Sequence, residues 1–362
     1  MEEIVEPEVI IVGGGLAGLF AAHLLEQNRT SYLLLEAKSV LGGRILSEPH
    51  PGADLGIDLG PTWFWDHQPR IGKLLKTLGL PVFKQYTQGD TFYQLGPNQL
   101  HRVQGQGAPI SYRLRGGMTS LIRALSADLP KKNILLDHAV TSAFKDGDVW
   151  VVQADASNRK SFQARHVMLA APPRIIARDI NFGGSLSAEL LIDLENTPTW
   201  MAGQAKFIAT YDQPFWREQG LAGQAFSRVG PMVEIHDASA WDDSGFALFG
   251  FLGWPAPTRR SMSSEDLENK CLQQLANIFG PKAAETLGFR LKDWALDMRT
   301  ATERDAREPS VHPEFQMVPF QKELQSLNLH LITSEFASQE AGYLEGSILA
   351  AEQGVMTMLR NR

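Results

Sequence analysis

The first 36 residues switch between two hydrophobic periods. Residues 9–12 are all apolar, which predicts a short buried strand of a parallel sheet, and residues 32–35 repeat this pattern. Between them, residues 16–27 show apolar positions at helical spacing. These positions are Leu16, Leu19 or Phe20, and Leu24. A strand, a helix and a strand in this order predict the start of an α/β domain with a parallel sheet.

A glycine motif lies between the first strand and the helix. Gly13, Gly15 and Gly18 follow the pattern G-x-G-x-x-G, and Glu36 comes directly after the second strand. In a dinucleotide site the first glycine makes the tight turn, the second admits the pyrophosphate, and the third allows close helix packing. The acid would accept hydrogen bonds from ribose hydroxyls. An ordinary glycine-rich turn is the alternative, but the ordered strand, turn, helix, strand and acid favour dinucleotide binding.

The rest of the chain first leaves this pattern and then returns to it. Strand-like runs at 133–140, 149–156 and 166–173 suggest a small β unit and one more buried strand. Runs at 206–216 and 245–254 indicate a different sheet, whereas 327–335 is again a buried strand. The final segment, 341–360, is predicted to be a helix with three residues on its apolar side: Ile348, Val355 and Leu359.

This return predicts a two-domain α/β (α+β) protein whose domains are both discontinuous. A Rossmann-like nucleotide domain would comprise residues 1–80, 112–173 and 297–362. A smaller, sheet-based substrate domain would comprise 81–111 and 174–296. The length of 362 residues agrees with about two domains.

Composition narrows the function class. The chain has 34 Lys and Arg against 41 Asp and Glu, a net charge of −7, so it lacks the basic excess of a nucleic-acid-binding protein. The single cysteine, Cys271, excludes an intramolecular disulfide and a cysteine metal cluster, and its helical context predicts a buried thiol. The start, MEEIVEPEV, lacks a signal-peptide pattern, and no apolar run reaches about 18 residues. We therefore expect a cytoplasmic protein without metal or membrane anchor; a homo-oligomer stays open.

Several motifs together resemble the flavin-containing amine oxidases, the family of monoamine oxidases, polyamine oxidases and L-amino-acid oxidases. They are LGGR at 41–44, DLGPTWF at 58–64, LRGGMTSLIRAL at 114–125, VMLAAPP at 167–173, KFIATYDQPFW at 206–216 and TSEFASQEAGYLEGSILAAEQG at 333–354. The resemblance covers most of the chain. It implies that the dinucleotide is FAD and not NAD.

The resemblance also implies which residues contact FAD. The pyrophosphate would lie at the glycine turn and at Gly43 and Arg44, whose charge would offset it, and Glu36 with its neighbour Ala37 would reach the ribose. The remaining expected contacts are Gly60, Pro61, Thr62 and Trp63 beside the flavin ring, Val140 at the adenine, and Glu335 near the ribityl chain. Each has a structural alternative: a turn glycine, a solvated arginine, a core tryptophan or a strand valine.

The resemblance implies that residues of the carboxyl-terminal segment and one lysine act on the flavin and on the substrate. Gly342, Tyr343 and Leu344 precede or open the last helix, so their N–H groups would stabilise negative charge on reduced flavin. Tyr343 also matches one wall of an aromatic cage for the substrate amine. Lys206, ten residues before Trp216, matches a lysine that holds a water near flavin N5; the alternative is a solvent-facing strand lysine.

Two departures limit the resemblance. After Trp294, where monoamine oxidases carry a flavin-linking cysteine and a second cage tyrosine, this chain has Glu303 and Arg304. FAD is therefore expected to be non-covalent, and one aromatic wall is missing. The substrate-domain insert is also short, so the cavity is expected to be wide, shallow or completed by another subunit, with Trp63, Trp65 and His67 as further lining residues.

The sequence as a whole predicts an FAD-dependent oxidoreductase of amine oxidase type. It would transfer a hydride from the carbon next to an amine to flavin N5, and dioxygen would reoxidise the flavin to give hydrogen peroxide. Two alternatives stay open. One is a flavin desaturase of the protoporphyrinogen-oxidase or carotenoid-desaturase kind, and the other is a non-catalytic FAD-binding scaffold.

Overall fold

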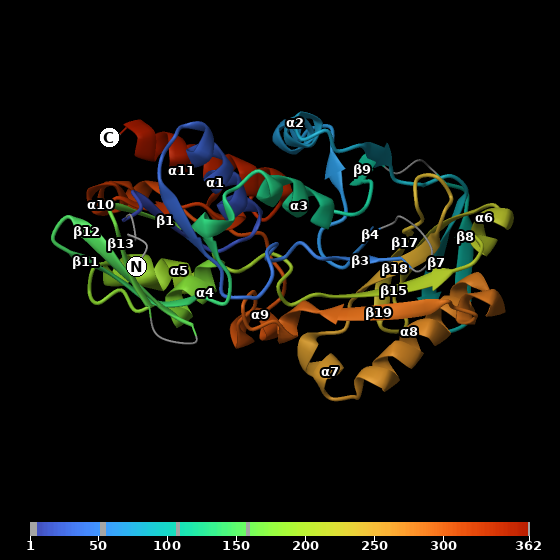
Figure 1. The fold of residues 1–362 in the computed structure, drawn as a ribbon. Helices are drawn as coiled ribbons and strands as arrows, with labels where there is room; N and C mark the ends of the chain where they lie inside the picture. The colour runs from blue at the N-terminus through green and yellow to red at the C-terminus, as the bar shows by residue number, and fades with distance from the viewer. Residues whose placement is uncertain (1–5, 51–55, 106–108, 157–159, 361–362) are drawn as a thin grey trace.

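The computed structural model describes residues 6–50, 56–105, 109–156 and 160–360, arranged in two lobes (Figure 1). Both ends of the described chain belong to the same lobe, where α1 (Leu16–Gln27) and α11 (Leu344–Arg360) pack side by side. The chain thus crosses to the second lobe and comes back, as the return of the sequence pattern predicts. Residues 1–5, on which the absence of a signal peptide was argued, lie outside the described part.

A parallel sheet forms the centre of the first lobe. Among the described residues its strand order is β10 (Ile134–Leu135), β2 (Tyr32–Leu35), β1 (Val9–Val12), β14 (His166–Leu169) and β20 (Leu329–Leu331). All neighbouring pairs are parallel, with Val9 opposite both Tyr32 and His166. The predicted Rossmann-like arrangement is confirmed.

Both faces of this sheet are covered, which explains why its strands are apolar without alternation. Val9 and Ile11 face a core that includes α1, α11 and α3 (Thr119–Ala127). Ile10 and Val12 face the opposite core. That second core is closed by the antiparallel sheet of β11 (Ala139–Asp146), β12 (Val149–Asp155) and β13 (Lys160–Ala164), and by α4 (Pro173–Asp179), α5 (Ala188–Asn196) and α10 (Gln321–Leu327).

Of the two predicted helices, α1 has the expected bounds, whereas α11 begins at Leu344 and not at residue 341; both bury wider surfaces than predicted. In α1, Leu24 is only half-buried whereas Leu25 is fully buried, because the helix is enclosed by the sheet and by α11. In α11, Ile348 and Val355 are buried as predicted. Leu359 is half-buried, and Met358 takes its place in the core.

The second lobe is built on a larger sheet. Within the described ranges its strand order is β19 (Gly288–Asp293), β15 (Ala205–Tyr211), β18 (Phe246–Leu252), β17 (Met232–Asp237), β16 (Leu221–Ser227), β7 (Asp90–Gly96) and β8 (Gln99–Val103). Neighbouring strands are antiparallel except β7 and β16, which are parallel. The runs at 206–216 and 245–254 are thus neighbours in one sheet, as expected.

The two faces of β15 have different neighbours. Ala205, Phe207 and Ala209 pack toward α8 (Ser264–Phe279), which also holds the buried Cys271. Ile208 packs on the other face against β4 (Gly56–Asp58) of the first lobe. Because side chains alternate along a strand, Lys206 shares the face of Ile208 and is buried between the lobes.

Shorter elements complete the structure. They are β3 (Ser47–Pro49), β5 (Phe64–Trp65), α2 (Pro69–Thr77), β6 (Val82–Lys84), β9 (Ser111–Leu114), α6 (Phe215–Glu218), α7 (Ala256–Arg260) and α9 (Glu303–Arg307). α4 and α5 pack on the core of the first lobe. The division into domains remains a proposal, and this packing favours assigning residues 174–196 to the nucleotide domain instead of the substrate domain.

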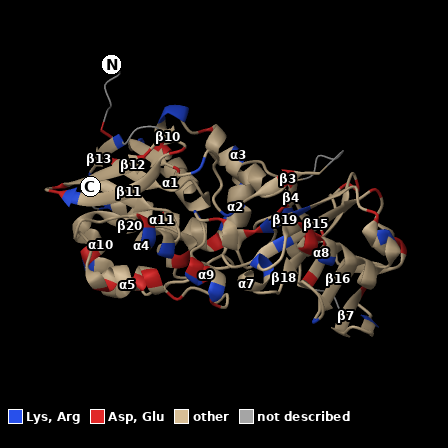
Figure 2. Cartoon of the chain, turned by 90° about the horizontal axis from the view of Figure 1, so that it is seen from below, with Lys and Arg blue, Asp and Glu red and all other residues tan. Residues whose placement is uncertain are grey.

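Charges of both signs are interspersed along the chain (Figure 2). Several are paired around α9: Arg174 with Asp305 at 2.8 Å, and Arg260 with Glu303 at 3.0 Å. The residues that the structure describes include no helix long and apolar enough to cross a membrane. They also hold no group of three or more His, Cys, Asp or Glu side chains that fits a metal ion.

Candidate active site

A cavity of about 610 Å³ lies between the two lobes. Its volume is within the roughly 300–1,000 Å³ typical of ligand pockets. At one end it is lined by Glu36 and Val140, beside the carboxyl ends of the parallel strands, and at the other by Lys206 and Phe251 of the second sheet. The cavity therefore connects the predicted nucleotide site with the predicted substrate site.

The glycine turn is shaped by contacts that exclude side chains. Gly13 has φ +111°, and a Cβ there would lie 2.7 Å from the carbonyl oxygen of Ala170. A Cβ on Gly18 would lie 2.0 Å from the Gly13 oxygen, so α1 approaches the turn only because Gly18 has none. Gly13 and Gly15 line the cavity, while Gly18 stands behind them. Gly15 also caps α1 without a side-chain hydrogen bond, which leaves N–H groups at the helix start for a ligand.

Glu36 connects the turn to the end of β2. Its Oε2 accepts a hydrogen bond from the Gly14 N–H at 2.6 Å, and its Oε1 accepts one from the Lys38 N–H at 2.9 Å. Glu36 and Ala37 line the cavity, as does Val140 on β11. The carboxylate is thus fixed by two backbone amides at the edge of the cavity, and its role in binding ribose hydroxyls stays a prediction.

Arg44 follows two glycines with positive φ, Gly42 at +124° and Gly43 at +60°. Its guanidinium donates to both oxygens of Glu335, at 2.6 and 3.0 Å, and to Ser334 Oγ at 3.2 Å. Burial disfavours the charged form of Glu335, but the charge and hydrogen bonds of Arg44 outweigh it and lower the pKa of Glu335. The expectation that Arg44 offsets a pyrophosphate charge is thus modified: Glu335 already balances that charge. Gly43 and Arg44 line the cavity, and Glu335 lies behind Arg44.

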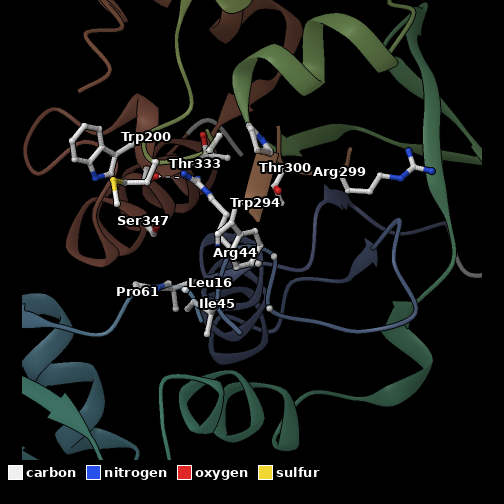
Figure 3. A pocket seen from close by; sticks show the side chains of 18 of the residues that line it. Leu16, Arg44, Ile45, Pro61, Trp200, Trp294, Arg299, Thr300, Thr333 and Ser347 are labelled. Atoms are coloured by element: carbon white, nitrogen blue, oxygen red, sulfur yellow. Dashed lines mark hydrogen bonds between the residues drawn. The ribbon is translucent and has the colours of Figure 1, made fainter. Parts of the chain in front are cut away.

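Thr333 provides an independent sign of a ligand. Its Oγ1 is buried and, among the described residues, has no hydrogen-bond partner, although Thr333 lines the cavity. In Figure 3 Arg44 and Thr333 lie close together, with Leu16, Ile45 and Pro61 grouped apart from them. A buried hydroxyl without a partner normally requires an explanation, and a polar ligand supplies one. The glycine turn, Glu36 and Thr333 together fit an elongated dinucleotide such as FAD.

The start of α11 differs in one respect from the sequence expectation. The Gly342 N–H donates to the Ser334 carbonyl at 3.2 Å, and the Tyr343 N–H donates to the Glu340 carbonyl at 3.1 Å. These two amides are engaged within the protein, because the chain makes a tight turn at Gly342, where φ is +87°. The expectation of free N–H groups at Gly342 and Tyr343 is thus wrong, and the stabilisation of reduced flavin stays a prediction for the first turn of α11, which begins at Leu344. Tyr343 and Leu344 both line the cavity.

Lys206 is only 2% exposed, so it is not a solvent-facing lysine. Its Nζ donates to the Gly60 carbonyl at 3.2 Å and to Thr62 Oγ1, and lies 4.1 Å from the centre of the Phe249 ring. Burial lowers the pKa of Lys206 to about 7; the Asp58 charge acts against this lowering and the Arg113 charge adds to it. Lys206 and Gly60, Pro61, Thr62 and Trp63 all line the cavity.

Aromatic rings surround the Lys206 end of the cavity. Trp65 meets Tyr343 edge to face at 6.1 Å between ring centres, and Trp200 lies 6.4 Å from the same tyrosine. Trp63 is fixed by a 2.8 Å hydrogen bond from its Nε1 to Gln85 Oε1. Trp63, Trp65 and Trp200 line the cavity, whereas the predicted His67 does not and its side chain is 64% exposed.

The segment after Trp294 lines the cavity only in its first part. Trp294 lines the cavity and its Nε1 donates to the Leu59 carbonyl at 2.9 Å. Glu303 pairs with Arg260, and Arg304 hydrogen bonds Glu308 and Asn196. Neither lines the cavity, so these two residues do not occupy the cage position at which the resemblance aligns them; the missing second aromatic wall stays a prediction. Arg299 and Thr300, which the sequence did not single out, line it instead (Figure 3).

Sequence reasoning missed other lining residues. Besides Thr333 they include Ala170, Pro172, Ile175, Trp200, Met201, Glu234, Phe251 and Ser347. The rule that ligands bind at the carboxyl ends of parallel strands indicates Ala170 and Pro172, because they follow β14 next to β1. Trp200 lies on the connection between α5 and β15, and Glu234 lies on β17 of the second lobe; no local pattern marks either residue.

Comparisons with known proteins agree with this geometry. A family model described as "Flavin containing amine oxidoreductase" matches residues 95–359, and one for an NAD(P)-binding Rossmann-like domain matches 11–78. The chain belongs to the flavin-containing amine oxidoreductase family.

The individual relatives have low sequence identity to this chain but align with most of its length. The probable flavin-containing monoamine oxidase A of Dictyostelium discoideum is 23% identical and covers 79% of this chain and 83% of its own length. The putrescine oxidase of Kocuria rosea is 22% identical over 74% of this chain and 79% of the relative. The structure of the cyclohexylamine oxidase from Brevibacterium oxydans IH-35A has a TM-score of 0.83 at 19% identity, covering 98% of this chain and 99% of that chain. The fold is therefore shared over almost its full length, and the chain is an FAD-dependent oxidoreductase of amine oxidase type.

Proposed function

We propose that this chain oxidises a small amine by transferring a hydride from the carbon next to the nitrogen to flavin N5. The observation that carries the proposal is that one continuous cavity joins Glu36 and the glycine turn to the buried Lys206 and to Tyr343. A scaffold protein has no need for a buried lysine beside an aromatic chamber at the end of its nucleotide site.

The residues that would hold FAD follow the length of the cavity. Glu36 and Val140 would contact the adenosine end, and Gly13, Gly15 and the start of α1 the pyrophosphate. Gly43, Thr333 and the segment 60–63 would contact the ribityl chain and the ring. Arg44 and Glu335 would shape this wall as a neutral pair. None of these contacts requires a covalent bond, and Cys271 is buried within α8.

The chemistry is divided between cofactor and protein. When bound, FAD accepts the hydride, leaving an imine that water hydrolyses, and passes two electrons to dioxygen to give hydrogen peroxide. Tyr343, Trp65 and Phe251 would exclude water and orient an amine in its neutral form, whose nitrogen lone pair assists hydride loss. Lys206 would place positive charge where dioxygen accepts its first electron.

The lining also indicates the substrate. Glu234 on β17 stands opposite Phe251 on β18, which in turn stands opposite Lys206 on β15, so the three lie in one row on the cavity side of the sheet. Strands are about 4.8 Å apart, so Glu234 is roughly 10 Å from Lys206 along the row. An acid at that place, beside aromatic rings, favours an aliphatic amine with a second positive charge. The putrescine oxidase relative carries such a substrate in its name.

Anaerobic mixing tests the activity. The purified, FAD-loaded protein is mixed without oxygen with monoamines, diamines, polyamines and amino acids, and the flavin absorbance is followed. Bleaching by an amine, with an aldehyde or keto product, supports the proposal. Bleaching only by compounds with an oxidisable carbon–carbon bond favours the desaturase alternative, and no bleaching at all favours a scaffold.

A matched pair of substrates tests the role of Glu234. Replacing it in Glu234→Gln removes the charge but keeps the shape, so the KM for putrescine should rise about tenfold, which is about 1.4 kcal/mol. The KM for butylamine should stay within about twofold. An equal change for both amines would contradict recognition of a second charge at Glu234.

Location and assembly stay proposals. A single cysteine leaves no intramolecular disulfide to maintain, which agrees with a cytoplasmic location. Size-exclusion chromatography with light scattering tests whether the chain forms a homo-oligomer.

A further inference from the structure

A short segment, residues 297–301, forms part of the cavity wall, and we call it the strap. Arg299 and Thr300 line the cavity from this segment. Met298, next to them in the chain, is 72% exposed to solvent. The strap is therefore a single layer of chain between the cavity and the solvent.

The strap is closed into a turn by its first residue. The carbonyl oxygen of Asp297 accepts the N–H groups of Thr300 and Ala301, both at 2.9 Å. Its side-chain Oδ1 accepts the Arg299 N–H at 3.1 Å. The strap thus keeps its shape through its own hydrogen bonds, and two anchors outside it fix its place on the molecule.

One anchor joins the strap to the loop that follows β2. The ammonium of Lys38 donates to Asp297 Oδ2 at 2.7 Å, and Lys292 lies 3.5 Å from the same oxygen. Burial disfavours the Asp297 carboxylate, but Lys38 and Lys292 outweigh burial and lower the pKa of Asp297, so this anchor is an ion pair. The backbone N–H of Lys38 donates to Glu36. The first anchor therefore lies directly beside Glu36.

The other anchor joins the strap to the end of α4. Arg178 donates to the carbonyl of Met298 at 2.6 Å and to that of Ala301 at 3.4 Å. The same guanidinium binds both oxygens of Asp179, at 2.6 and 2.9 Å. From the strap, Arg299 lies 3.8 Å from Asp179, which also lines the cavity.

Both anchors lie next to residues expected at the adenosine of FAD. The first is beside Glu36, the residue proposed for the ribose. The second is close to Val140, the residue proposed for the adenine, because the N–H of Asn181, two residues after Asp179, donates to the Thr141 carbonyl at 2.9 Å. The strap therefore extends along the adenosine end of the cavity.

The pairing of the cations shows which of them is left for a ligand at this end. Among the described residues, four Lys or Arg side chains line the cavity: Lys38, Arg44, Lys206 and Arg299. Two of them have a carboxylate within hydrogen-bond distance, Arg44 at Glu335 and Lys38 at Asp297. A third, on β15, lies at the far end of the cavity. Arg299 has only the 3.8 Å contact described above, and its side chain is 46% exposed.

We propose that Arg299 is a cofactor-binding residue that contacts the ADP half of FAD, and that the strap closes the cavity over this half. The proposal rests on the placement of FAD proposed above, with its adenosine near Glu36. A guanidinium suits ADP because it pairs with phosphate oxygens and also stacks on aromatic rings. In Figure 3 the Arg299 side chain extends away from that of Arg44, so the two arginines serve different parts of the cavity.

Binding of ADP to the apoprotein tests Arg299 without flavin and without catalysis. In Arg299→Gln the Kd for ADP, measured by calorimetry, should rise about tenfold, and the Kd for FAD by a similar factor, because both ligands share the contact. Arg307→Gln is the matched control on α9, where Arg307 is 74% exposed and lies 3.9 Å from Glu303. It should keep both Kd values within about twofold of the unchanged protein.

The rate of FAD release tests whether the strap closes the cavity. The holoprotein is diluted into excess ADP, which occupies the vacated site, and the change in flavin fluorescence gives the rate. Asp297→Ala removes the anchor at Lys38, so FAD should leave about tenfold faster. Electrostatics alone predicts the opposite sign, because this exchange removes a negative charge near a pyrophosphate and would slow release.

The outcomes separate this inference from the placement of FAD. An ADP affinity in Arg299→Gln within about twofold of the unchanged protein, or an equal loss in Arg307→Gln, overturns the role of Arg299. Release from Asp297→Ala that is no faster overturns the closing role of the strap. A loss of ADP affinity in Glu36→Ala but not in Arg299→Gln rejects Arg299 alone, whereas unchanged affinity in both variants also rejects the placement of the adenosine.

Discussion

Arg44 and Glu335, separated by 291 positions in the chain, are joined by two hydrogen bonds of 2.6 and 3.0 Å. The Glu335 side chain is fully buried, and that of Arg44 is a quarter exposed. The pair links the loop after β2 to the segment before α11, both of which line the cavity. The two charges cancel, so the ion pair adds no net charge to this wall of the candidate FAD site.

The first prediction concerns this pair. Glu335→Ala leaves Arg44 without its anion and should lower the free energy of unfolding by roughly 2–4 kcal/mol, less than for a fully buried pair because Arg44 is partly exposed. Arg44→Met combined with Glu335→Met should cost less than the sum of the single changes. Urea unfolding at pH 7 measures both. Additive losses would show that the two side chains do not act as a unit.

The same pair predicts a pH dependence. The folded-state pKa of Glu335 lies below its ordinary value of 4.5, so its contribution to stability is complete above that value and is lost as the pH falls through the folded pKa. Unfolding free energy should therefore fall in the acid range more steeply for the unchanged protein than for Glu335→Gln. Equal slopes below pH 4.5 would contradict this sign.

The next prediction concerns the nucleotide end of the cavity. Glu36→Ala removes a carboxylate that is held by the Gly14 and Lys38 amides, and should weaken FAD binding by about 1.5–3 kcal/mol. Fluorescence titration of the apoprotein with FAD measures the affinity. Glu26→Ala, an exposed position on α1, is the control and should change it little. An unchanged affinity in Glu36→Ala would remove Glu36 from the site.

A further prediction is that FAD is bound without a covalent link. Acid precipitation of the yellow holoprotein should release all of its flavin into the supernatant. The single cysteine lies in α8, buried behind the second sheet, and burial raises its pKa to about 12, so its thiol is not reactive. Flavin that stays with the pellet would contradict the prediction.

The last prediction tests Lys206 in the reaction itself. Lys206→Met should slow reoxidation of the reduced enzyme by dioxygen about a hundredfold, which corresponds to about 2.7 kcal/mol of transition-state stabilisation. FAD affinity should fall far less than in Glu36→Ala, because Lys206 bonds to the segment beside the flavin ring and not to the glycine turn or to Glu36, which would hold the pyrophosphate and the ribose. Stopped-flow measurement after photoreduction gives the rate; a value within about twofold of the unchanged protein would reject the role.

Local sequence patterns were sufficient to predict the fold of the nucleotide-binding part. A strand that is buried on both faces is recognised from a continuous apolar run, and a turn without room for a Cβ from its glycines. Both signals lie within a few neighbouring residues. The first 36 residues therefore determined the turn at Gly13, the close approach at Gly18 and the acid at Glu36. The family motifs then placed Lys206, Tyr343 and the segment 60–63 at one cavity. These features depend on the order of residues along one strand, turn or helix.

Only the tertiary structure decided which charges meet. Alternation along β15 shows that Lys206 and Ile208 share a face, but not that the face is covered by β4 of the other lobe. For the same reason no sequence pattern could pair Arg44 with Glu335 or leave Thr333 without a hydrogen-bond partner among the described residues. The sequence determines what each element presents on its surface; the packing of the two lobes determines what that surface contacts, and with it the charge state of the site.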